Sequence, residues 1–172
     1  MKVAYYPGCT LQGSSHEYDE SIKVVCDYLD VELVEIPDWS CCGASSAHAT
    51  DHWLSIVLPA RNLVKAEELG ISRLLVPCAA CYNRLKAAEK ALKEEPEMYL
   101  PHVGAGHHAK YRGELTILHA NDFFAQSELI EKLRKKVVKP LKNLRVVPYY
   151  GCLTARPPKV TDMEDYEDPK SM

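Results

Sequence analysis

Five of the seven cysteines follow one spacing, and thiols in such numbers indicate metal or redox chemistry. The spacing is C-x31-CC-x35-C-x2-C, and its members are Cys9, Cys41, Cys42, Cys78 and Cys81. Seven is an odd count, and the first residues lack the long apolar core of an export signal, so a framework of structural disulfides explains these cysteines poorly. Metal ligation or thiol redox chemistry is the first hypothesis.

The local sequence around these cysteines favours the thiolate form and allows the side chains to converge on one site. Cys78 and Cys81 lie at an expected helix start, where free N–H groups and the helix dipole favour thiolate over thiol. Cys41 and Cys42 are adjacent, and adjacent residues of an extended chain point to opposite faces. Both can serve one site only if the backbone turns there, which Gly43 permits.

Three kinds of chemistry are open to five thiols. A structural zinc ion takes four ligands, and a cubane iron–sulfur cluster also takes four cysteines, so one cysteine is spare in either case. An iron–sulfur cluster more open than a cubane would use all five, and thiol–disulfide exchange needs no metal. Soft thiolates suit all three, so composition does not separate them.

Alternating strands and helices are expected to position the cysteines. Helices are predicted near residues 14–30, 51–69, 81–92 and 127–136, with Pro59 either kinking the second or starting its second part. Strands are predicted at residues 2–7, 31–36, 73–76, 114–119 and 144–150. This order predicts an α/β layered domain with a mainly parallel sheet. The carboxyl ends of parallel strands share one edge, and each of the five cysteines follows a strand, so their site is expected there.

A sequence motif that occurs twice in the chain suggests a second structural unit. Residues 4–9 read Ala-Tyr-Tyr-Pro-Gly-Cys and residues 147–152 read Val-Pro-Tyr-Tyr-Gly-Cys, each a strand that would deliver a cysteine. A chance recurrence is the alternative. We expect a first domain at residues 1–146 and the beginning of an incomplete second one at 147–172. A tail from Leu153 to Asp168 without its neighbours should be poorly ordered.

Composition excludes several classes of function. The net charge is −3, and no basic stretch is interleaved with aromatic residues, so nucleic acid is not an expected partner. No segment approaches the roughly 20 apolar residues of a membrane span, and we expect a cytoplasmic protein. No dinucleotide fingerprint, Walker loop or nucleophile elbow occurs.

The remaining candidates have ordinary structural interpretations. Cys26 lies on the apolar side of a predicted helix and should be buried as a small hydrophobic residue. His48 and His52 could donate to the site, but loop or helix-start histidines explain them as well. Solvated positions are expected for His102, His107, His108 and the lysines and arginines of residues 131–142.

The cysteine pattern resembles that of the CCG-domain family, typified by the B subunit of heterodisulfide reductase. The matching motifs are Cys9, Cys41-Cys42-Gly43, Ala60-Arg61-Asn62-Leu63, Pro77-Cys78-Ala79-Ala80-Cys81-Tyr82, Tyr149-Tyr150-Gly151-Cys152 and Arg156-Pro157-Pro158. The resemblance implies that Cys9, Cys41, Cys42, Cys78 and Cys81 hold a non-cubane [4Fe-4S] cluster through which they act in catalysis. It implies that Cys152 is a possible first ligand of a second site whose other ligands are absent.

The resemblance also implies an activity and partners. The B subunit of heterodisulfide reductase reduces the disulfide of coenzyme M and coenzyme B, and its electron-transfer partners are an iron–sulfur C subunit and a flavoprotein A subunit. Only the first motif is whole, so the resemblance does not extend to turnover by this chain alone. The alternatives are a CCG subunit for a lactate-, succinate- or glycerol-phosphate-linked system, and a noncatalytic zinc-stabilised interaction module.

Overall fold

A four-stranded parallel sheet organises the chain. The computed structural model describes residues 1–103, 110–149 and 151–171. Its strands are β1 (Lys2–Tyr5), β2 (Glu32–Glu35), β3 (Arg73–Val76) and β4 (Thr116–His119), in the order β2-β1-β3-β4. Every pair is parallel, with Lys2 opposite Glu32, Ala4 opposite Leu74 and Arg73 opposite Thr116. The expected α/β architecture is confirmed.

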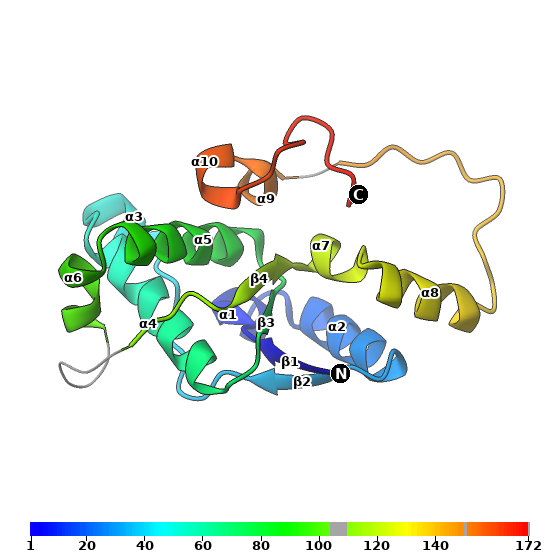
Figure 1. Cartoon of the computed structure of the whole chain (residues 1–172). Helices are drawn as coiled ribbons and strands as arrows, with labels where there is room; N and C mark the ends of the chain where they lie inside the picture. Colours follow the sequence, from blue (N-terminus) through cyan, green and yellow to red (C-terminus); the bar gives the residue numbers. More distant parts are fainter. Residues whose placement is uncertain (104–109, 150, 172) are drawn as a thin grey trace.

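Helices cover both faces of this sheet (Figure 1). They are α1 (Gly8–Gln12), α2 (His16–Tyr28), α3 (Ser46–Thr50), α4 (Leu54–Glu68), α5 (Ala79–Glu94), α6 (Pro96–Tyr99), α7 (Ala120–Phe124), α8 (Ser127–Lys136), α9 (Cys152–Ala155) and α10 (Pro158–Thr161), with a 3-10 turn at Leu100–His102. The helix α4 is unbroken at Pro59. None of the helices in the described ranges combines the length and apolar character needed to cross a bilayer.

Alternating strand residues divide the core into two layers. Ala4 and Leu74 face one side, where they pack with apolar residues of α4 and α5. Val3 and Leu75 face the other side and pack with residues of α2, α7 and α8. Because side chains of a strand alternate between faces, a shift of one residue in register would exchange these two layers. The core on both faces therefore fixes the register of the strands from which the loops of the carboxyl edge start.

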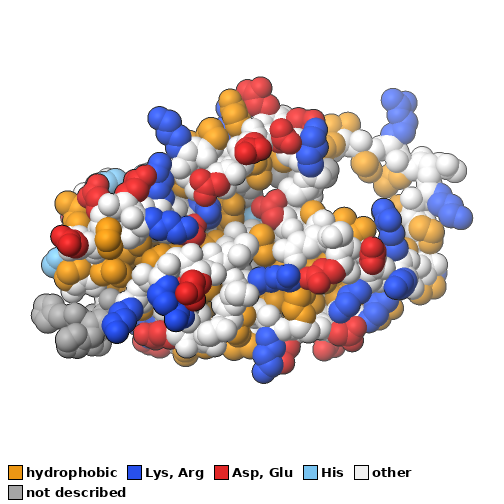
Figure 2. Space-filling view, viewed as in Figure 1, with side chains coloured by type: hydrophobic (Ala, Val, Ile, Leu, Met, Phe, Trp, Pro, Cys, Tyr) orange, Lys and Arg blue, Asp and Glu red, His pale blue; other side chains and the backbone are white. Residues whose placement is uncertain are grey.

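The expected fifth strand at residues 144–150 is not formed by the residues described there. Residues 137–149 are exposed coil, with Val147 91% and Tyr149 98% exposed. Figure 2 shows open space between this segment and the body of the molecule. Its apolar composition favours a strand, but a strand also needs a neighbouring strand to pair its backbone, and residues 144–149 have none in the sheet, whose order is β2-β1-β3-β4.

The tail expected to be poorly ordered is instead packed on α5. Asn83 of α5 donates from Nδ2 to the carbonyls of Leu153 and Arg156, at 3.0 and 2.9 Å. Ala155 and Thr161 are buried against the body. The prediction was wrong because it assumed that this tail has no neighbours, whereas its two short helices, α9 and α10, lie over α5 (Figure 1).

Candidate functional site

Three adjacent strands deliver the predicted cysteines to one edge of the sheet. Cys9 follows β1 and lies in α1, Cys41 and Cys42 follow β2 in a loop, and Cys78 and Cys81 follow β3. Because β1 lies between β2 and β3, the three segments leave the sheet side by side. We call Cys9, Cys41, Cys42, Cys78 and Cys81 the five-cysteine site.

The thiols of this site approach one another across long sequence separations. Cys9 Sγ lies 3.7 Å from Cys41 Sγ, and Cys42 Sγ lies 3.3 Å from Cys81 Sγ. Cys78 shares a hydrogen bond with the Cys81 thiol. A disulfide bond is about 2.05 Å long, so these are free thiols in contact. The Cys9–Cys41 and Cys42–Cys81 contacts each join segments that follow different strands. The Cys78–Cys81 contact lies at the start of α5.

Two glycines allow this close approach. Gly8 has φ +72°, and a Cβ atom at this position would lie 2.8 Å from Cys81 Sγ. Gly43 has φ +71°, and its N–H donates to Cys41 Sγ at 3.4 Å. The expectation that the backbone turns at Gly43 is thereby confirmed, since L-residues rarely adopt this φ.

The site is buried on one side and open on the other. Cys42 and Cys81 are each 2% exposed, and Cys78 is partly buried. Cys9 and Cys41 are exposed. A reactant or partner would therefore meet the Cys9 and Cys41 side first, while the opposite side excludes water.

Hydrogen bonds within the site favour thiolates at two positions. The hydrogen bond with Cys81 lowers the pKa of Cys78 to about 6, with help from the N–H groups of Cys81 and Ala80 at the start of α5 and against the effect of burial. The hydrogen bond with Cys81 likewise lowers the pKa of Cys42 to about 7. Those same two hydrogen bonds, together with burial, raise the pKa of Cys81. A lowered thiol pKa was expected only at this helix start, and the structure adds Cys42 in the neighbouring loop.

Tyr6 lies behind the site, and nothing in the cysteine spacing indicated it. Burial raises the pKa of the Tyr6 phenol, and the neighbouring Cys81, Cys42, Cys41 and Cys9 raise it further. The phenol is therefore a neutral hydrogen-bond donor, and it donates to the Ser40 carbonyl at 2.7 Å. Its position directly after a strand and before Pro-Gly-Cys is the one sequence feature that could have identified it.

The other candidates have surroundings of different kinds. Cys26 is fully buried among apolar residues, as expected. His48 Nδ1 lies 3.0 Å from Arg84 Nη1, and His102 packs edge-on against Trp53. His52 is exposed, and His107 and His108 lie outside the described residues. Cys152 is exposed at the start of α9.

Of the basic residues of α8, Arg134 and Lys135 are exposed, as expected, whereas Lys132 and Lys136 are partly buried. Lys132 donates to the Leu29 carbonyl at 2.8 Å, and Lys136 donates to that of Tyr28. Figure 2 shows Lys and Arg side chains gathered over this end of the molecule. Two of these lysines therefore hold α8 against the carboxyl end of α2, where cations also offset the helix dipole.

The donor set of the five-cysteine site fits an iron–sulfur cluster. All five donors are sulfur, the ligand type that holds such clusters. Within residues 1–103, 110–149 and 151–171, no three His, Cys, Asp or Glu side chains are arranged to hold a single metal ion. A cluster of several irons does not need that arrangement, because each sulfur can bind a different iron.

Residues 3–86 match the model of the CCG cysteine-rich domain. This range includes all five cysteines of the site and ends in α5, before β4 and the C-terminal helices.

Relatives that match nearly the whole of this chain include subunits of two kinds of reductase. The 8-methylmenaquinol:fumarate reductase membrane anchor subunit of Wolinella succinogenes is 34% identical over 99% of this chain and 59% of its own length. The B subunit of a CoB-CoM heterodisulfide reductase of Methanosarcina acetivorans, dependent on ferredoxin or F(420)H(2), is 29% identical over 98% of this chain and 56% of its own. A protein of Archaeoglobus profundus that is named as similar to the heterodisulfide reductase B subunit is 25% identical over 98% of this chain and 57% of its own length. The chain therefore spans little more than half of these relatives.

Proposed function

We propose that this chain, whose residues 3–86 match the CCG cysteine-rich domain, is the iron–sulfur redox subunit of a multi-subunit reductase. The proposed cluster ligands are Cys9, Cys41, Cys42, Cys78 and Cys81. The single observation that carries the proposal is the approach of thiols from three separate segments at one sheet edge, with Cys9 reaching Cys41 and Cys42 reaching Cys81.

A cluster on these ligands supplies one-electron transfer, and a non-cubane [4Fe-4S] form is the proposal that uses all five thiols. The hydrogen bonds with Cys81 lower the pKa values of Cys42 and Cys78, which favours the thiolate form that binds iron. Tyr6 and the buried thiols exclude water from the inner side. Burial and hydrogen bonds to sulfur tune the reduction potential of such a centre. The hydrogen bond from the Gly43 N–H to Cys41 Sγ is therefore expected to affect this potential.

The substrate we propose first is the disulfide of coenzyme M and coenzyme B. Its reduction takes two electrons and two protons and yields two thiols. The open Cys9 and Cys41 side gives a disulfide sulfur access to the site, and the relatives named as B subunits of heterodisulfide reductase support this assignment. Electrons would come from an iron–sulfur protein like the C subunit of that enzyme, itself supplied by a flavoprotein like the A subunit.

A second candidate is supported by the 34% identity with the fumarate reductase subunit. In that function the site would pass electrons between a quinol-linked partner and a separate fumarate-reducing subunit, which adds two electrons and two protons to fumarate. The open side of the site would then be a partner-docking side rather than a substrate pocket.

We propose that residues 147–172 begin a second cysteine-rich unit, with residues 1–146 as the first. The exposed apolar segment before Cys152 is the observation in favour, because it has strand composition without a paired strand. The additional length of the relatives is consistent with such a unit. In that case Cys152 would be the first ligand of a second site completed by residues outside this sequence.

The experiment that separates the two substrates uses anaerobic protein reduced with dithionite. Reoxidation of the reduced centre is followed optically after addition of the coenzyme M–coenzyme B disulfide, or of fumarate with the partner subunits. Rapid reoxidation by the disulfide alone supports the first candidate. Reoxidation only with fumarate and partners supports the second, and a protein with stoichiometric zinc and no iron contradicts both.

A further inference from the structure

Asn62 of α4 is fully buried and contacts both backbone polar groups of Ser40. Its Oδ1 accepts a hydrogen bond from the Ser40 N–H at 2.9 Å, and its Nδ2 donates to the Ser40 carbonyl at 2.8 Å. The amide thus takes the place of the backbone partner that a neighbouring strand would supply. One side chain from a helix therefore fixes the backbone directly before Cys41 and Cys42.

The segment that carries Cys9 meets the same carbonyl. Tyr6 directly follows β1, and its hydroxyl donates to the Ser40 carbonyl at 2.7 Å. Asn62 Nδ2 lies 3.4 Å from the Tyr6 hydroxyl. The two segments whose thiols make the Cys9–Cys41 contact are thus joined at the Ser40 carbonyl oxygen.

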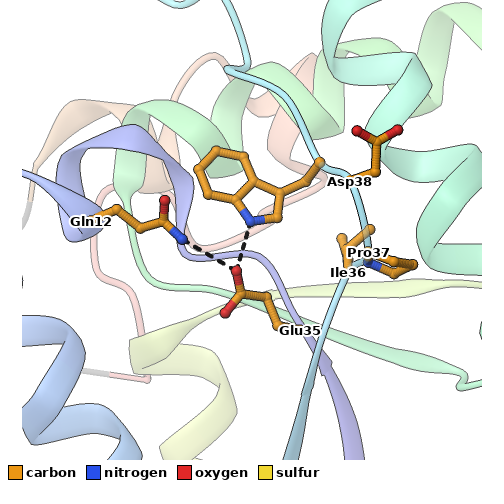
Figure 3. Close-up of a pocket in the computed structure, with 6 residues that line it drawn as sticks. Gln12, Glu35, Ile36, Pro37 and Asp38 are labelled. Atoms are coloured by element: carbon orange, nitrogen blue, oxygen red, sulfur yellow. Dashed lines mark hydrogen bonds between the residues drawn. The ribbon is translucent and has the colours of Figure 1, made fainter.

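An outer set of contacts supports the same loop at the surface. Arg61 of α4 donates to the Asp38 carbonyl and carboxylate, at 2.7 and 2.6 Å. Glu35 accepts from Trp39 at 2.8 Å and from Gln12 of α1 at 3.2 Å, on the wall of an open hollow of about 470 Å³ (Figure 3). These groups are exposed or half-exposed, so water competes for their hydrogen bonds, whereas the Asn62 side chain is fully buried.

We infer that Asn62 is the positioning residue of the five-cysteine site. It sets the backbone at Ser40 so that Cys41 Sγ reaches Cys9 and Cys42 Sγ reaches Cys81. The two thiols are on adjacent residues and have different partners, so a rotation of the backbone at Ser40 moves both away. The inference rests on the proposed function for what the thiols hold, and on the geometry alone for how they are placed.

The chain offers a matched control on the same helix. Glu67 is also buried on α4, and its carboxylate accepts from the N–H groups of Arg112 and Glu114, at 2.7 and 3.0 Å. It fixes a different loop, which carries none of the five cysteines. Glu67→Ala therefore removes a comparable pair of buried contacts without touching the cysteine loops.

The first measurement compares cluster content and spectrum in Asn62→Ala, Asn62→Asp and Glu67→Ala. Asn62→Ala should lose bound iron severalfold. Asn62→Asp keeps the acceptor for Ser40 N–H but loses the donor to the carbonyl, so it should retain more iron with altered electron paramagnetic resonance and a shifted reduction potential. Glu67→Ala should lower the free energy of unfolding while leaving both the spectrum and the potential unchanged.

The second measurement needs no cluster. The metal-free chain is treated with diamide, which accepts the two electrons and two protons that each thiol pair loses on forming a disulfide. Peptide mapping then gives the yield of the Cys9–Cys41 bond relative to the Cys78–Cys81 bond, whose partners both lie at the start of α5. Asn62→Ala should lower this ratio severalfold, and Glu67→Ala should leave it unchanged.

Each outcome decides the inference. If the wild type binds no cluster, the proposed function fails, but the disulfide ratio still tests Asn62. If Asn62→Ala does not fold, Asn62→Asp takes its place in both measurements. An unchanged ratio, spectrum and potential in a folded Asn62 variant would overturn the inference and leave Asn62 a structural residue.

Discussion

Cys9 Sγ and Cys41 Sγ lie 3.7 Å apart, although 31 residues separate them in the chain. They meet because β1 and β2 are neighbouring parallel strands, paired from Lys2–Glu32 to Tyr5–Glu35, and because a short segment leads from each strand to its cysteine. The sheet order therefore sets the sulfur geometry, and changes at the strand ends should affect the bound centre before they affect the fold.

Single Cys→Ser variants of the five-cysteine site should each lower the bound iron, because a hydroxyl is a much poorer ligand than a thiolate for iron in such clusters. Iron per chain after anaerobic purification is the measurement. Cys26→Ala is the control, since Cys26 is buried against apolar residues of α2 and the sheet, and it should keep the iron of the wild type. Full iron in Cys9→Ser would remove Cys9 from the ligand set.

Gly8→Ala should disrupt the site as well as strain the backbone. The new Cβ would lie 2.8 Å from Cys81 Sγ, at a φ of +72°. Gly70→Ala isolates the strain, because Gly70 has φ +66° and open space around its Cβ position. Each variant should lose about 1–2 kcal/mol of unfolding free energy from the positive φ.

Only Gly8→Ala should lose iron and change the spectrum. Chemical denaturation and iron analysis of both variants provide the comparison. Equal iron in the two variants would mean that the approach of Gly8 to Cys81 is not needed for the centre.

The tail helices should detach when Asn83 is shortened. Asn83→Ala leaves the carbonyls of Leu153 and Arg156 without their donor, at a cost of about 1–3 kcal/mol. Hydrogen exchange should rise over α9 and α10 while the core of β1 and β3 stays protected. Lys90→Ala, which removes an exposed contact to the Lys159 carbonyl, is the control and should change exchange little. Protection of α9 that survives in Asn83→Ala would contradict this role.

His119 should make the fold less stable in mild acid. Burial lowers the pKa of His119 below its usual 6.5, against the opposing effects of Asp122 and the Pro77 carbonyl, and His119 Nδ1 accepts from the Asn121 N–H. The unfolded chain therefore takes up the proton more readily than the folded one. The stability contributed by neutral His119 is present above pH 6.5 and is lost as the pH falls below it.

The measurement is the free energy of unfolding of wild type and His119→Gln at several pH values. The difference between the two proteins isolates His119 from the other histidines. The wild type should lose more stability than the variant between neutral pH and pH 5. Parallel curves would show that His119 does not carry this dependence.

The fold could be predicted where local pattern and tertiary structure agree. Arg73–Val76 and Ser127–Lys136 have the bounds that the sequence predicts, because a short apolar run and an amphipathic stripe each have one way to bury their apolar side. The strand expected at residues 144–150 is absent from the described residues 144–149, because an apolar composition does not supply the neighbouring strand with which a strand must pair.

The cysteines of the candidate site could be identified from spacing, but their supports could not. Thiol counts and a Cys-Cys-Gly turn are visible in the sequence, whereas the role of Asn62 depends on α4 crossing the loop before Cys41. For Tyr6 the sequence predicted only a place in a strand and no role at the site. Short helices such as α1, α3 and α9 escaped because four or five residues carry too little periodicity to recognise.

The most direct test of the central claim is the iron and acid-labile sulfide content of anaerobically purified protein, with electron paramagnetic resonance of the same sample. We expect about four irons and four sulfides per chain. We also expect a paramagnetic signal in one oxidation state that is lost when any of the five cysteines is replaced by serine. A full signal that survives replacement of Cys9 or Cys41, or a protein with zinc in place of iron, would contradict the claim.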